Sequence, residues 1–188
     1  MDRQNIIRRL AEQVTEDELR RIFPEIPPDD IRDILLEKKR LPGNGNSRQN
    51  ENLRCSLYTD GASRGNPGPA GAGAILFDAD GRELATKAQF LGRCTNNVAE
   101  YKALILGLLL ADKIGCRHLD IFLDSELIVR QLTGRYKVKN PSLKSLFSQA
   151  QQLLQGFTGF SVSHIPRAKN SRADKLANQG IDERSSDD

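Results

Sequence analysis

Apolar residues recur along the chain with two different spacings, and the spacing changes near residue 53. Before that point they fall at intervals of three and four residues, which predicts short amphipathic helices. After it, short apolar runs alternate with longer stretches of helical period, which predicts an α/β fold with a mixed sheet. In chain order we expect strands over residues 54–60, 70–78 and 82–90, a helix over 97–113, a strand over 117–124, a helix ending near 132, a helix over 142–155, a strand over 157–165 and a helix from 172 onward.

The first 40 residues are predicted to form a small unit of three short helices. Thr15 and Glu18 have the spacing of a capping box, and Pro27 opens the third helix. Residues 41–52 are rich in Gly and Asn and predict a flexible linker to a domain over residues 53–184. The first 50 residues carry no net charge and no Trp or Tyr. We therefore expect this unit to make a protein–protein contact or to support the main domain, rather than to bind nucleic acid.

Composition excludes several classes of protein. Apolar residues make up 38% and charged residues 28% of the chain, as in soluble globular proteins. The longest apolar stretch, residues 103–111, is too short to cross a bilayer, and the N-terminus lacks the apolar core of a secretory signal. We therefore expect a cytoplasmic protein with no membrane partner. The net charge of +3 permits nucleic-acid binding without arguing for it.

The cysteines give no sign of a metal site or a disulfide framework. Cys55, Cys94 and Cys116 are odd in number, form no C-x-x-C pair and have only two histidines to join them. In an intracellular protein this pattern predicts three reduced thiols.

Four carboxylates stand where predicted elements begin or end. Asp60 and Asp124 each close a strand, and if these strands are parallel neighbours both acids meet at the sheet edge where α/β proteins bind ligands. Glu100 and Asp174 lie in the first turns of two helices. Four converging carboxylates would repel one another unless cations bind, and hard oxygen ligands suit Mg²⁺ or Mn²⁺. Two such ions can support hydrolysis of a phosphodiester without a protein nucleophile.

Each acid also has a purely structural alternative. Asp60 could open a turn with Gly61, and Asp124 could cap the helix that follows it. Glu100 and Asp174 each lie three residues after a potential cap, so both could close capping boxes. Spacing alone does not decide between these alternatives and a metal site.

The sequence around the four acids resembles the ribonuclease HI family. The similar segments are YTDGASRGNPGPAG, TNNVAEYKALILGL, DSELIVRQLTG and HIPRAKNSRADKLAN, each with one acid, in the family's order within residues 54–181. The resemblance implies a ribonuclease H-like five-stranded mixed sheet with helices on both faces. It also implies that the four acids bind Mg²⁺, with Mn²⁺ as the alternative and two ions per site, and cut the RNA strand of an RNA/DNA hybrid to leave 3′-hydroxyl and 5′-phosphate ends.

The resemblance extends to residues that contact substrate. It implies that Asn66, Thr95, Asn96 and Asn97 contact the minor groove of the hybrid, where amides and hydroxyls can bond the RNA 2′-OH without demanding a sequence. Asn66 could instead only shape its turn, and Asn97 could only cap a helix. Next to the acids, Gly61 and Ser125 are further expected substrate contacts.

Two features depart from many members of the family. The loop before the last acid is short, and His164 falls at the end of the final strand. Its spacing from Asp174 could match the family's loop histidine, but its neighbours Ile165 and Pro166 favour a strand position, where it would pack or support a site residue. Arg167 could take over that auxiliary role by meeting a phosphate. The basic protruding helix is absent, which is typical of the compact subgroup. In its place, Lys137, Lys139 and Lys144 could contact phosphates of the DNA strand, or could form only a solvated surface.

The sequence thus predicts a metal-dependent ribonuclease H. A non-catalytic hybrid- or RNA-binding module is the main alternative, although such a module has no need of carboxylates that repel phosphate. A broader nuclease that also cuts double-stranded RNA is the other.

Overall fold

The computed structural model of this chain describes residues 53–183. The predicted helical unit of residues 1–40 and the linker of residues 41–52 lie outside the described residues and stay predictions. Within residues 53–183, no helix is both long enough and apolar enough to cross a membrane.

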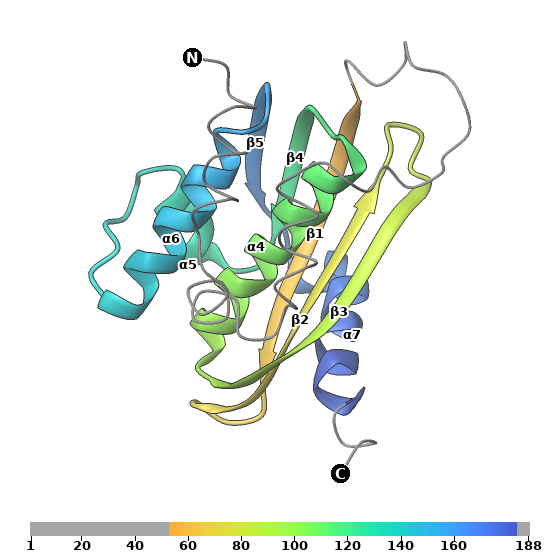
Figure 1. Ribbon diagram of the computed structural model, residues 1–188. Coiled ribbons are helices and arrows are strands. Elements are labelled where there is room, and N and C mark those ends of the chain that lie inside the picture. Colours follow the sequence, from red (N-terminus) through yellow and green to blue (C-terminus); the bar gives the residue numbers. More distant parts are fainter. Residues whose placement is uncertain (1–52, 184–188) are drawn as a thin grey trace, which may run out of the picture. The chain divides into compact units, whose positions relative to one another are not determined.

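A five-stranded mixed sheet forms the centre of the domain (Figure 1). Its strands lie in the order β3-β2-β1-β4-β5. The first three strands are antiparallel, whereas β4 runs parallel to both β1 and β5. This confirms the predicted mixed sheet. It also shows that the strand that carries Asp60 and the strand that precedes Asp124 are parallel neighbours, the condition under which both acids meet at one edge. The strands are β1 (Arg54–Ser63), β2 (Gly68–Phe77), β3 (Glu83–Cys94), β4 (His118–Leu123) and β5 (Gly159–His164).

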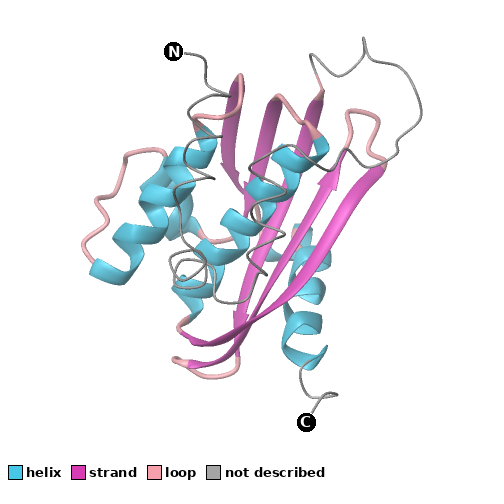
Figure 2. Cartoon of the chain, viewed as in Figure 1, coloured by secondary structure: helices cyan, strands magenta, loops and turns pink. Residues whose placement is uncertain are grey.

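Helices cover both faces of the sheet, as the resemblance implied (Figure 2). The long helix α4 packs on one face together with α6, and α7 packs on the other face against β1, β2 and β3. A short 3-10 turn, η2, leads into α7. The helices are α4 (Asn96–Ile114), α5 (Glu126–Leu132), α6 (Pro141–Leu154) and α7 (Ser171–Asp182), and η2 is Arg167–Lys169.

Successive residues of β2 face the two helical layers in turn. Ala72 and Ala74 are fully buried in the apolar clusters on the α4 side. Gly73 faces α7 instead, and a Cβ there would lie 2.3 Å from the carbonyl oxygen of Ala173. The backbone of α7 therefore approaches the sheet more closely than any side chain at this position would allow. This approach brings the first turn of α7, with Asp174, to the sheet edge.

Two predicted boundaries are wrong in ways that matter for the site. Strand β1 does not end at Asp60 but continues to Ser63, because Asp60–Ser63 pairs with residues 70–73 of β2. The Gly/Pro-rich turn is accordingly limited to residues 64–67. Glu100 is the fifth residue of α4 and so lies beyond its first turn.

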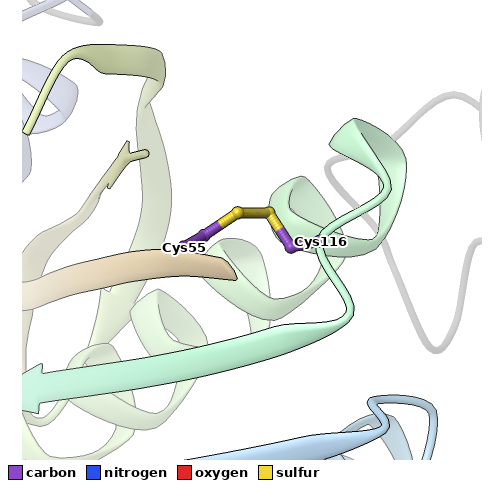
Figure 3. The surroundings of a disulfide bond; sticks show 2 residues. All are labelled: Cys55 and Cys116. Carbon is purple, nitrogen blue, oxygen red and sulfur yellow. A yellow bond between two sulfur atoms is a disulfide. The ribbon is translucent and has the colours of Figure 1, made fainter. Parts of the chain in front are cut away.

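The prediction of three reduced thiols is also wrong. Cys55 and Cys116 form a disulfide, with their Cα atoms 6.0 Å apart (Figure 3). Cys55 lies near the start of β1 and Cys116 lies between α4 and β4. Because β1 and β4 are parallel neighbours, the segment that enters β4 passes beside the start of β1 and brings the two cysteines together. Cys94 remains a free thiol.

Candidate active site

Three of the four predicted acids converge at the edge of the sheet. Asp60, Glu100 and Asp124 each place a carboxylate oxygen within 4.8 Å of the others. They come from β1, from α4 and from the residue directly after β4. Segments that lie 24 to 64 residues apart in sequence thus form one acidic group, a convergence that sequence spacing alone could not establish.

The β1–β4 pairing and one glycine produce this convergence. Tyr58 pairs with Phe122 across the parallel strands, so the acids two residues later on each strand emerge side by side. Gly61 then admits the helix: a Cβ there would lie 2.2 Å from the backbone of Ala99 and Glu100. Only glycine lets α4 approach β1 this closely, and the approach is what brings Glu100 to the two aspartates.

Asp174 lies beside the group of three acids but is not part of it. Its Oδ1 accepts a hydrogen bond from Nη2 of Arg167 at 2.6 Å. Its charge still acts on the site, because it contributes to raising the pKa of Asp60. The structure therefore brings all four acids into one region, with the fourth paired to an arginine.

The structural alternatives for the acids are not supported. The residues that cap α4 and α7 are Thr95 and Asn170, and neither makes a side-chain capping bond. Neither helix begins with the capping box that the spacing allowed. Ser125, not Asp124, is the cap residue of α5.

Burial and mutual repulsion raise the pKa of two of these acids, Asp60 and Glu100. Burial first, and then the charges of Asp124 and Asp174, raise the pKa of Asp60 to about 7. Burial first, and then Asp60 and Asp124, raise the pKa of Glu100 to about 8. The guanidinium of Arg167 opposes both shifts. Such a site favours taking up positive charge, either as protons or as a cation.

The donor set fits a hard divalent cation. The three converging side chains offer only carboxylate oxygens, which Mg²⁺ and Mn²⁺ prefer. Among residues 53–183, no His or Cys belongs to this group, so softer metals find no nitrogen or sulfur ligand in it. Asp60 is nearly buried, at 5% exposure, whereas Asp124 is only partly buried, which leaves the group open to solvent on one side.

The predicted substrate contacts surround the acids. Asn66 Oδ1 accepts a hydrogen bond from the backbone N–H of Asn96 at 3.2 Å, which ties the β1–β2 turn to the start of α4. Asn96 Nδ2 in turn donates to Glu100 Oε1 at 3.4 Å. Asn66, Asn96 and Asn97 are exposed, and Thr95 is half-buried. Gly61 is buried against α4, and Ser125 is half-buried next to Asp124.

The two auxiliary candidates occupy different environments. His164 is the last residue of β5, pairs with Leu123 and is exposed, and its expected auxiliary role stays a prediction. Arg167 is also exposed, at 79% of its side chain, yet it bonds Asp174 and its charge reaches Asp60, Glu100 and Asp124.

Sequence reasoning missed one residue of the site. Asn170 is 1% exposed, and its Nδ2 donates to Asp124 Oδ1 at 2.9 Å and to the carbonyl oxygen of Thr59 at 3.0 Å. Its position four residues before Asp174 was the available signal. An Asn before a helix is an ordinary cap, however, so no pattern in the sequence assigns it another role.

Comparison with known proteins bears on the same residues. The family described as reverse transcriptase-like matches residues 58–180, a span that contains all four acids. Ribonuclease HI of Halobacterium salinarum is 45% identical over 130 residues, which make up 69% of this chain and 65% of that protein. The crystal structure of RNase H1 from the same organism has a TM-score of 0.68 and is covered over 98% of its chain. The chain belongs to the ribonuclease H family.

Two further members of the ribonuclease H family bear on how far the similarity extends. Bifunctional protein Rv2228c of Mycobacterium tuberculosis is 47% identical over 131 residues, which are 69% of this chain but only 36% of that protein. LC11-RNase H1, solved in complex with an RNA/DNA hybrid, is 44% identical, with a TM-score of 0.64 and coverage of 69% of this chain and 97% of that one. The chain thus matches about a third of the longer relative and nearly all of the compact one.

Proposed function

We propose that this protein is an endoribonuclease that hydrolyses the RNA strand of RNA/DNA hybrids. The observation that carries the proposal is the convergence of Asp60, Glu100 and Asp124 at one sheet edge, with Asp174 beside them. Membership of the ribonuclease H family supports the same activity, and LC11-RNase H1 was solved with the hybrid that we propose as the substrate.

The four acids are the proposed ligands of two Mg²⁺ ions, with Mn²⁺ as a substitute. When bound, these ions activate a water molecule and stabilise the leaving oxygen of an in-line displacement, which leaves 3′-hydroxyl and 5′-phosphate ends. The protein's own part is to hold the carboxylates together despite their repulsion. Asp60 is fixed within a strand, and Glu100 is fixed by the close packing of α4 on Gly61.

Substrate recognition is proposed to fall to the polar residues around the acids. The exposed amides of Asn66, Asn96 and Asn97 lie on the two segments that flank Glu100, together with Thr95. Such groups bond base edges and 2′-hydroxyls of a hybrid without reading its sequence. Gly61 and Ser125 adjoin the aspartates, and we propose that they contact the strand that is cut.

Positive charge near the acids is proposed to meet phosphates. Arg167 presents an exposed guanidinium next to Asp174, a geometry suited to a phosphate oxygen or a leaving group. His164 is exposed at the end of β5, opposite Leu123, the last residue of β4, and we propose only an auxiliary role for it. The exposed Lys137, Lys139 and Lys144 are proposed contacts of the DNA-strand phosphates.

A cleavage assay on end-labelled RNA/DNA, RNA/RNA and DNA/DNA duplexes tests the proposal. With Mg²⁺ we expect cutting of the RNA strand of the hybrid alone, and with EDTA we expect no cutting. Equal cutting of RNA/RNA would widen the substrate class. Binding of the hybrid without any cutting, in Mg²⁺ and in Mn²⁺, would show a binding module and overturn the proposal.

A further inference from the structure

Two asparagines precede helices in this domain, and they use their side chains differently. Asn140 caps α6 in the usual way, since its Oδ1 accepts from the backbone N–H groups of Ser142 at 2.9 Å and Leu143 at 3.4 Å. Asn170 stands at the same position before α7 and makes no capping bond. The stabilisation that an asparagine normally gives to a helix start is therefore absent at α7.

The amide of Asn170 points instead into the protein. Its Nδ2 donates to Asp124 Oδ1 and to the backbone oxygen of Thr59, so both amide hydrogens are used. These two bonds join the start of α7 to β1 and to the end of β4, the strands that carry Asp60 and lead to Asp124. The side chain thus connects three elements of the site at 1% exposure.

Besides the missing capping bond, the orientation of the Asn170 amide leaves its Oδ1 without a donor among the described residues. With Nδ2 committed to two acceptors, Oδ1 is fixed in a buried position where no described residue donates to it. A buried acceptor without a partner lowers stability. Asn170 therefore lacks both a helix-capping bond and a partner for Oδ1, and directs its amide at Asp124 and the backbone of Thr59.

We propose that Asn170 is a positioning residue that fixes the Asp124 carboxylate for binding a divalent ion. The inference rests on the proposed function of the four acids as metal ligands. Asp124 follows the last residue of β4 and is only partly buried, and carboxyl oxygens of Asp60 and Glu100 lie within 4.8 Å of it. The hydrogen bond that the Asn170 amide donates to Oδ1 at 2.9 Å holds the Asp124 carboxylate in place within this crowded group.

Isothermal titration of Mn²⁺ into the full chain tests this inference without relying on activity. Loss of a partner that orients a metal ligand typically weakens metal binding about 10- to 100-fold. We expect a loss of this size in Asn170→Ala. The matched control is Asn140→Ala, which removes a working cap: we expect it to lower Tm and to leave the Mn²⁺ affinity within about twofold of wild type.

A double-mutant cycle separates positioning from general disturbance. In an Asp124→Asn background, Asn170→Ala should cause little further loss of Mn²⁺ affinity, because the carboxylate that it positions is already gone. If Asn170→Ala does not fold by circular dichroism, Asn170→Ser replaces it, since serine is too short to reach both acceptors. Unchanged Mn²⁺ affinity in a folded variant, or a full additional loss in the Asp124→Asn background, would overturn the inference.

The same titration distinguishes this inference from the proposed function. A wild-type chain that binds Mn²⁺ but cuts no hybrid would refute the nuclease proposal and still decide the role of Asn170. A wild-type chain that cuts the hybrid but shows equal Mn²⁺ affinity in Asn170→Ala would refute only the positioning role. Absence of Mn²⁺ binding by the wild type would overturn both.

Discussion

Asp60 and Glu100 are poised between binding protons and binding a cation. Their pKa values, about 7 and about 8, mean that in the metal-free site these two groups gain and lose protons close to neutral pH. A divalent ion must displace those protons, so its affinity should rise with pH through this range. The close carboxylates thus lower the stability of the ion-free protein when they are charged, and the same charge favours the binding of a cation.

The stability of the metal-free protein should therefore fall as pH rises. The pKa of Asp60 is raised from 3.8 and that of Glu100 from 4.5, so the folded state binds these protons more tightly than the unfolded chain. Their stabilising contribution is complete below about pH 4 and is lost as pH rises through about 7 and about 8. Between these limits the free energy of unfolding should fall, for each of the two groups, by up to about 1.4 kcal/mol for every unit by which the pH rises.

Urea denaturation in EDTA at several pH values measures this slope. We expect Asp60→Asn to unfold with a shallower pH dependence, because it removes one titrating group and part of the charge that raises the pKa of Glu100. Equal slopes for wild type and Asp60→Asn would contradict the account of the site's charge.

At the scale of the elements, the geometry of the site depends on two places where a helix lies unusually close to a strand. Gly61 lets α4 lie against β1, and Gly73 lets α7 lie against β2. In both places an added Cβ would come within 2.3 Å of helix backbone, so a side chain could fit only if the helix moved. Glu100 and Asp174 are carried by these two helices, and their positions therefore depend on residues that carry no functional group.

Gly61→Ala should damage activity more than it damages the fold. The new methyl would displace α4 at Ala99 and Glu100, at a cost of about 1–3 kcal/mol of stability. A displacement of about 1 Å at Glu100 should slow cleavage about 100-fold. Gly107→Ala is the comparison variant: it adds a methyl on α4 itself, against side-chain methyl groups of Leu57 and Thr59 rather than against backbone.

Rates of hybrid cleavage and urea denaturation of both variants test this account. We expect Gly107→Ala to keep activity within a few-fold of wild type. Comparable activity in Gly61→Ala and wild type would show that the close packing of α4 on β1 does not position Glu100.

Most elements were predictable because their patterns are local. The antiparallel hairpin of β2 and β3 turns at Asp80 and Gly81, where Gly81 has a φ of 78°. The parallel pairing of β1 and β4 is not local, and the sequence left it open. The extension of β1 beyond Asp60 was not predictable, because its continuation begins with Gly61 and leads into a run of Gly and Pro that ordinarily ends a strand. There, pairing with β2 outweighs local preference.

At the scale of the whole molecule, the features that sequence could not supply depend on contacts between distant segments. The disulfide joins residues 61 positions apart and could not be inferred from an odd number of cysteines. Asn170 carries the ordinary signature of a helix cap, and only the fold reveals that it bonds Asp124. The four acids were predictable because family resemblance, rather than spacing, identified them, and the fold then brought three of them together.

The central claim is that a chain with a net charge of only +3 acts on a polyanion through its acidic sheet edge. The most direct test is single-turnover cleavage of an RNA/DNA hybrid in Mg²⁺ by wild type, Asp124→Asn and Asp120→Asn. Asp120 is the matched control, since it lies on β4 but pairs with Arg54 and Ser161 away from the acids. We expect Asp124→Asn to lose at least about 100-fold in rate, more than a residue that only orients a ligand, and Asp120→Asn to cut like wild type. Undiminished cleavage by Asp124→Asn, or an equal loss in both variants, would contradict the account.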